Sequence, residues 1–183
     1  MNRVRFFINT IALLVASQAI GQKYTAEKAF ISFFSDAAIE DITAENTKVS
    51  TLFNSATGDL VFSVPIKDFR FAKSLMQEHF NEKYMESDKY PMASFKGKIN
   101  ENVDFSKSGE TKVTATGKLS IHGVEHEVTV PGTVVVKDGE ISIRSDFSVL
   151  VKDYNITIPQ LVFQNIAENI AVKVNIQYAP YKK

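Results

Sequence analysis

Apolar and polar residues alternate along most of this chain, and this alternation constrains the fold more than any other feature of the sequence. One clear segment places Leu60, Phe62, Val64 and Ile66 on the same face. In another segment, lysine, threonine and serine occupy one face. The opposite face is small or apolar and consists of Val113, Ala115, Gly117, Leu119 and Ile121. A period of two is typical of a β-strand with one buried face and one solvated face. We therefore predict about eight such strands.

Turn signals separate these strands and favour antiparallel pairing between neighbours. Asp138-Gly139 is a strong two-residue hairpin turn, and a second turn is expected at His122-Gly123-Val124. The same pattern would suit a sandwich of two sheets, but we favour an eight-stranded antiparallel β-barrel, an all-β fold whose single helical insert closes one end. The presumed inner faces also carry small residues, which either let the strands coil tightly or leave volume unfilled: Ala93, Gly97, Ala115 and Gly117.

The stretch Phe69–Phe95 departs from the strand pattern. Its apolar stripe has the spacing of a short helix: Ala72, Leu75, Met76, His79 and Phe80. Asp68 is the expected helix cap. We predict that this insert closes one end of the barrel and forms the mouth of an elongated apolar cavity.

The first 21 residues have the pattern of a secretory signal peptide. Arg3 and Arg5 precede the mostly apolar run Phe6–Ala16, and small residues at Ala19 and Gly21 suit cleavage before residue 22. The alternative is a membrane anchor, but the run is shorter than the roughly 20 apolar residues that a spanning helix needs. We expect a signal peptide over residues 1–21, one barrel domain over residues 22–183, no membrane span after cleavage, and a periplasmic or secreted location.

Charge and cysteine content exclude several classes of function. Residues 1–21 contain two cations and no anions, so their removal changes the formal net charge from 0 to −2, which argues against a nucleic-acid partner. The chain has no cysteine, which excludes disulfides, thiolate metal sites and a cysteine nucleophile. An exported protein without disulfides suits a bacterial periplasm or secreted space.

Three histidines raise the question of metal or catalytic chemistry. His122 and His126 flank Glu125, but they lie in a strand–turn–strand without a third ligand, so we predict no metal site. His79 lies on the apolar stripe of the insert, where it is expected to be a hydrogen-bonded residue near the mouth or to contact a ligand head group. No nucleotide-binding or hydrolase fingerprint is present, and no catalytic residue is assigned.

Three runs of sequence resemble the YceI family of exported lipid-binding proteins: His79–Ile99 (HFNEKYMESDKYPMASFKGKI), Gly117–Gly132 (GKLSIHGVEHEVTVPG) and Asp153–Pro159 (DYNITIP). The resemblance extends from Lys23 to Tyr178. It implies an extended, lipocalin-like eight-stranded barrel with a helical insert, which holds a polyisoprenoid chain such as an isoprenoid quinone in an apolar tunnel. True lipocalins typically carry a tryptophan near the first strand; this chain has none, so the likeness to lipocalins concerns architecture only.

The residues agree with a neutral, elongated apolar ligand, because the presumed inner faces carry no Lys or Arg to pair with a fatty-acid carboxylate. Each candidate lining residue could equally be ordinary core: Phe62, Phe71, Leu75, Met76, Phe80, Tyr84, Met85, Phe95, Leu119, Ile121 and Phe147.

The sequence thus predicts a non-enzymatic protein that holds a polyisoprenoid lipid for transport, storage or sensing, without a metal or a cofactor other than that lipid. Whether two copies of the chain form a homodimer is left open. One alternative is a barrel-type isomerase or hydrolase that acts on an apolar substrate through His79. Another is a stress-related envelope protein with an empty barrel.

Overall fold

The computed structural model describes residues 23–36, 41–158 and 167–181. The expected signal peptide and its cleavage point lie outside these residues. The described strands are β1 (Lys23–Ser35), β2 (Ile42–Asn46), β3 (Ser50–Asn54), β4 (Asp59–Pro65), β5 (Arg70–Phe71), β6 (Met92–Ile99), β7 (Gly109–Ile121), β8 (Val124–Lys137), β9 (Glu140–Leu150) and β10 (Asn169–Pro180). Helical segments are η1 (Ile66–Asp68), α1 (Ser74–His79), the π-helical η2 (Phe80–Tyr84) and η3 (Val151–Tyr154).

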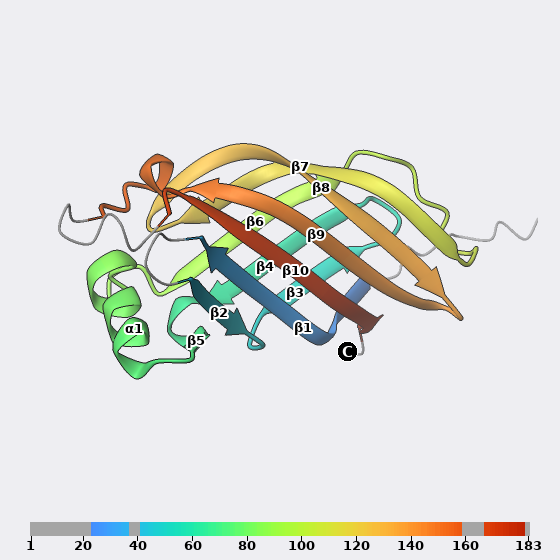
Figure 1. Ribbon diagram of the computed structural model, residues 1–183. Helices are drawn as coiled ribbons and strands as arrows, with labels where there is room; N and C mark the ends of the chain where they lie inside the picture. Colours follow the sequence, from blue (N-terminus) through green and yellow to red (C-terminus); the bar gives the residue numbers. More distant parts are fainter. Residues whose placement is uncertain (1–22, 37–40, 159–166, 182–183) are drawn as a thin grey trace, which may run out of the picture.

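Within the described residues, eight antiparallel strands close into a barrel in the order β1-β10-β9-β8-β7-β6-β4-β3 (Figure 1). β1 closes the ring because it pairs with β10 along one edge, while Lys23–Thr25 pair with β3 along the other. Beyond a register shift between Ala26 and Lys28, the second half of β1 pairs instead with β2, which pairs with β5. The predicted eight-stranded barrel is confirmed, and the sandwich is excluded.

Two-residue turns join β7 to β8 and β8 to β9. His122 and Gly123 have φ angles of 51° and 76°, and Asp138 and Gly139 have 52° and 83°. Positive φ at both central residues matches the right-handed twist of the flanking strands. Both turns lie where the sequence predicts them.

Gly97 and Gly117 face each other across β6 and β7. A Cβ built on Gly117 would lie 2.3 Å from the Lys96 carbonyl oxygen and 2.4 Å from the Gly97 Cα, and one on Gly97 would lie 2.5 Å from the Phe95 ring. These glycines therefore let two strands approach closely; of the two explanations open at the sequence level, the structure selects tight coiling over unfilled volume. Ala93 and Ala115, by contrast, line the cavity described below.

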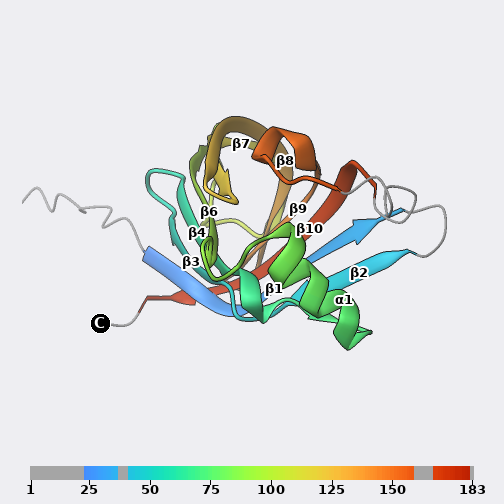
Figure 2. The same ribbon diagram turned by 90° about the vertical axis from the view of Figure 1, so that its left-hand side faces the viewer.

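The insert differs from the prediction in one respect. Asp68 does not cap the helix, because it belongs to η1 and β5 intervenes before α1 begins at Ser74, after Lys73. Ala72 also precedes the helix. Local pattern reading places the helix too early because a two-residue strand that pairs with distant β2 cannot be recognised from its own sequence. Figures 1 and 2 show α1 beside one end of the barrel.

Two apolar clusters fill the two ends of the barrel. At the end away from α1, the Tyr24, Phe105 and Tyr178 rings lie 5.3–6.0 Å from the Phe53 ring, and the buried Tyr178 hydroxyl is 2.9 Å from Thr51 Oγ1. This aromatic packing closes that end. The other cluster gathers beneath the insert and includes Ile31, Ala44, Val49, Val64, Ile66, Phe69 and Met85.

Candidate functional site

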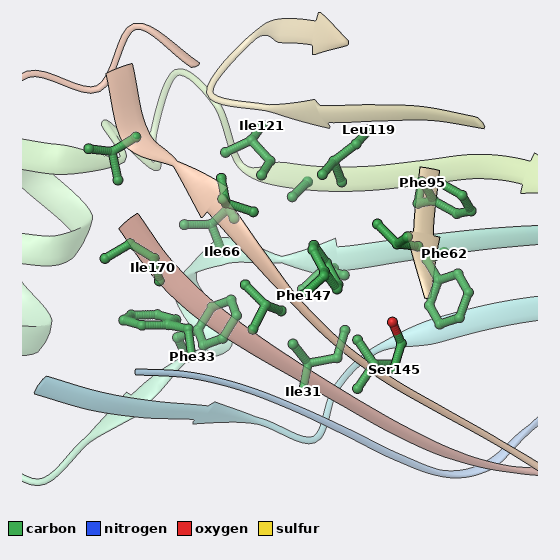
Figure 3. Close-up of a pocket in the computed structure, with 18 of the residues that line it drawn as sticks. Ile31, Phe33, Phe62, Ile66, Phe95, Leu119, Ile121, Ser145, Phe147 and Ile170 are labelled. Carbon is green, nitrogen blue, oxygen red and sulfur yellow. The ribbon is translucent and has the colours of Figure 1, made fainter. Parts of the chain in front are cut away.

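A cavity of about 540 Å³ lies inside the barrel between the two clusters. This volume is in the range of pockets that hold small molecules, roughly 300–1,000 Å³. Among the described residues, every strand of the barrel except β3 contributes to its wall; Figure 3 shows Ile31, Phe62, Leu119 and Phe147 among the contributing side chains. Among the described residues, the wall contains no Asp, Glu, Lys or Arg.

The structure brings all eleven predicted lining residues, and His79, into the wall of this one cavity. The helical segments supply the end of the cavity near α1, with Leu75, Met76, His79, Phe80 and Tyr84, and Met85 follows directly. The strands supply the side wall, with Phe62 from β4, Phe71 from β5, Phe95 from β6, Leu119 and Ile121 from β7, and Phe147 from β9. Their contact with a ligand stays a prediction.

Sequence reasoning missed the contributions of β1, β8, β10 and the segment after β9. Those strands and that segment add Ile31, Phe33, Val128, Val130, Val151, Ile156, Ile170, Val172 and Val174 to the wall. The alternation in Ile170–Tyr178 was a usable signal for β10. In β1 the signal was ambiguous because both faces carry aromatics, and the register shift between Ala26 and Lys28 alters which face points inward.

An aromatic cluster anchors the insert to the barrel. The Phe33 ring of β1 lies 5.3 Å from Phe69, 5.7 Å from Phe71 and 5.4 Å from Phe80. Phe80 in turn lies 5.7 Å from Phe69 and 5.0 Å from Phe71. Aromatic pairs at these distances attract each other beyond their burial alone. These rings therefore form part of the cavity wall at the insert end, beside the exposed side chains of Leu75 and His79.

The polar groups of the cavity wall are few and separate from one another. The polar residues that line it are Ser35, His79, Tyr84, Ser94 and Ser145. Burial raises the pKa of Tyr84, so its hydroxyl stays neutral. His79 is exposed at the rim; its hydrogen bonding there, or its contact with a ligand head group, stays a prediction. Ser145 Oγ donates to the Pro131 carbonyl oxygen at 2.6 Å.

The other two histidines connect distant segments. His122 is buried; its Nδ1 lies 3.1 Å from the Tyr154 carbonyl oxygen and its Nε2 lies 3.0 Å from Glu86 Oε2. His126 Nε2 donates to the Asp153 carbonyl oxygen at 2.8 Å. His122 thus ties the insert and η3 to the β7–β8 turn, and His126 ties η3 to β8.

His122 and His126 therefore bond different groups and do not converge on one point. In the described part of the chain, no group of three or more histidine and acidic side chains is placed to hold a metal ion. The described helices are also all too short or too polar to cross a membrane.

Comparison with known proteins gives one family and a set of similar folds. Residues 23–178 match the YceI-like domain family. A polyisoprenoid-binding domain from Saccharophagus degradans, implicated in plant cell wall breakdown, is similar with a TM-score of 0.73 and 15% identity, over 86% of this chain and 98% of that one. BcnA of Burkholderia cenocepacia has a TM-score of 0.70 and 19% identity, over 81% and 95%. A YceI protein of Campylobacter jejuni has a TM-score of 0.56 and 17% identity, over 100% and 94%. No curated protein matches this chain.

Proposed function

This chain belongs to the family of YceI-like domains, and from that premise we propose that it binds one long, neutral polyisoprenoid lipid inside its barrel. The observation that carries the proposal is the cavity itself: about 540 Å³ in volume, with no charged side chain among its described wall residues. The similar domain from Saccharophagus degradans is a polyisoprenoid-binding domain, which supports the same class of ligand here.

The chemistry of the wall favours a neutral chain over a fatty acid. A carboxylate placed in this cavity would lack a cation, and an unpaired buried charge is costly. Each methylene of an apolar chain, by contrast, contributes about 0.8 kcal/mol when it leaves water. The branched methyl groups of a prenyl chain would pack against the phenylalanine, leucine and isoleucine side chains of the wall.

We propose binding rather than catalysis, against the alternative of an enzyme that uses His79. A nucleophile and its general base must lie within hydrogen-bond reach. Among the described polar side chains of the wall, none is hydrogen-bonded to another: Ser145 bonds the Pro131 carbonyl oxygen, and Ser35 bonds the backbone N–H of Ala167. His79 at the exposed rim would instead lie near a quinone or phenol head group that points towards solvent.

Export completes the proposal. A signal peptide over residues 1–21 would deliver the mature domain to the periplasm or the medium, where a carrier could move, store or sense a prenyl lipid such as an isoprenoid quinone. A homodimer is compatible with this role.

The test is organic extraction of protein purified from the native host, followed by mass spectrometry and by titration with a fluorescent prenyl alcohol. We expect a prenyl lipid to be extracted and the probe to bind, while a fatty acid of equal carbon number binds more weakly. Failure of both the extraction and the titration would refute lipid binding and favour an empty barrel.

A matched pair of variants tests the site. Leu119→Asn places an amide in the cavity wall, whereas Ser120→Asn adds the same amide at the next position of β7, outside the wall. An unpaired buried amide costs roughly 1–3 kcal/mol, so Leu119→Asn should weaken prenyl binding by about tenfold. Ser120→Asn should leave binding unchanged; equal effects of the two variants would contradict this cavity as the site.

A further inference from the structure

The hydrogen-bond ladder of the barrel is incomplete between β8 and β9. β8 pairs with β7 from Val124 to Val136, and β9 pairs with β10 as far as Leu150. β8 and β9 pair with each other only from their shared turn to Thr133 opposite Arg144. Within the described residues, 124–132 of β8 and 145–150 of β9 therefore have a strand partner on one side only; we call the space between them the β8–β9 gap. In Figure 1, β8 arches over β9 on the side of α1.

The gap begins at Gly132, next to a proline. Pro131 has no N–H to donate to a ladder, and its carbonyl oxygen accepts instead from the Ser145 hydroxyl at 2.6 Å. A Cβ built on Gly132 would lie 3.0 Å from the Arg144 carbonyl oxygen, so the strands are still close at that point. The Ser145–Pro131 bond is thus the last link between β8 and β9 before they separate.

The cavity reaches both edges of the gap. Val128 and Val130 of β8 and Phe147 of β9 all line it, and all three are only half-buried. On the outer surface, a groove bounded by Lys112, Arg144, Glu110 and Asp146 shares four residues with the cavity wall: Val113, Pro131, Gly132 and Ser145. At this point one layer of residues separates the cavity from the surface.

A second contact bounds the gap at its far end. There the His126 ring bonds the Asp153 carbonyl oxygen of η3 at 2.8 Å, which joins the start of β8 to the segment that follows β9. Between this bond and the Ser145–Pro131 bond, β8 and β9 can part without breaking any backbone hydrogen bond of a ladder.

We propose that the lipid enters and leaves the barrel sideways through the β8–β9 gap. The Ser145–Pro131 hydrogen bond holds the gap closed and must break for it to open. This inference rests on the proposed function. Passage at the insert end would have to displace the packed rings of Phe33, Phe69, Phe71 and Phe80. Val128, Val130 and Phe147 at the gap are half-buried, as are Phe33, Phe71 and Phe80, but no ring contact among the described residues joins the two edges of the gap. A long chain could therefore slide in along its whole length.

The experiment bridges the gap chemically. Because the chain has no cysteine, Thr129→Cys/Ser148→Cys introduces the only two thiols, on exposed positions on opposite sides of the gap. A bis-maleimide spacer then joins them. The matched control, Thr116→Cys/Thr129→Cys, receives the same spacer across β7 and β8, which are already paired at these positions. The readout is the rate at which a fluorescent prenyl alcohol moves from loaded protein to phosphatidylcholine vesicles, together with its equilibrium affinity.

We expect the bridge across the gap to slow transfer by about tenfold or more, because opening of the gap would limit the rate, while the control bridge leaves the rate unchanged. Ser145→Ala should speed transfer roughly two- to tenfold, the effect of losing one hydrogen bond. A bridged protein that binds the probe normally and releases it at the control rate would overturn the lateral route. Loss of binding in the unmodified protein would instead refute the proposed function, and this inference with it.

Discussion

The buried His122 gives the sharpest test of how the insert is held on the barrel. Its ring bonds the Tyr154 carbonyl oxygen and Glu86, and it lies 4.5 Å from the Tyr90 ring in an edge-on arrangement. His122→Ala removes all three contacts. His126→Ala is the matched control, because His126 is exposed and loses one bond to a carbonyl oxygen and one edge-on ring contact with Tyr154.

The magnitude follows from burial. The His122 side chain is 8% exposed, whereas that of Glu86 is 48% exposed, so the contact between His122 and Glu86 contributes little. The main loss is the Tyr154 carbonyl oxygen left without its partner, at about 1–3 kcal/mol, plus about 1 kcal/mol for the ring contact with Tyr90. We expect His122→Ala to lower the free energy of unfolding by about 2–4 kcal/mol and His126→Ala by less than about 1 kcal/mol.

The assay is urea denaturation followed by far-UV circular dichroism, with Tm from a thermal scan as a second measure. A chain of this size loses about 2–4 °C of Tm per kcal/mol, so His122→Ala should lower Tm by roughly 5–15 °C. A double-mutant cycle with Glu86→Ala isolates the contact between His122 and Glu86 and should give a coupling free energy below about 1 kcal/mol. Equal, small losses for His122→Ala and His126→Ala would refute the assignment of His122 as a structural tie.

Three further predictions concern the closed end, the paired glycines and the N-terminus. Gly117→Ala should cost about 1–3 kcal/mol in urea denaturation, because its Cβ would lie 2.4 Å from the Gly97 Cα, whereas Gly109→Ala, with nothing within 4 Å, should cost little. Burial raises the pKa of Tyr178 above its ordinary value of 10.0; the folded chain therefore keeps a proton that the unfolded chain releases, and stability should fall as the pH rises above about 10. Tyr178→Phe should reduce this alkaline loss, and an unchanged pH profile would contradict it. Mass spectrometry of the exported protein should find a chain that begins at Gln22, and a mature chain that retains Arg3 would refute cleavage there.

Much of the fold could be predicted because it depends on local pattern. Alternation with period two identifies the buried face of each strand, and Asp138-Gly139 and His122-Gly123 determine where two hairpins turn. Those two signals were enough for antiparallel strands with one buried face and for the inward side of Phe62, Leu119 and Phe147; the pairing of β1 with both β10 and β3 decides for the barrel over the sandwich. Absence of cationic residues from the inner faces could also be read directly, because it needs only the face assignment.

Tertiary structure alone decided which strands pair, where their pairing stops and which distant side chains meet. Alternation cannot show that β8 and β9 stop pairing at Thr133 and Arg144, because the end of the pairing depends on how the two strands diverge around Pro131. Nor does it tell that Gly97 opposes Gly117 or that His122 meets Glu86, 36 residues earlier. Local sequence sets which side of a strand is apolar, whereas register, gaps and long-range hydrogen bonds arise from closure of the whole sheet, where every strand is constrained by two neighbours at once.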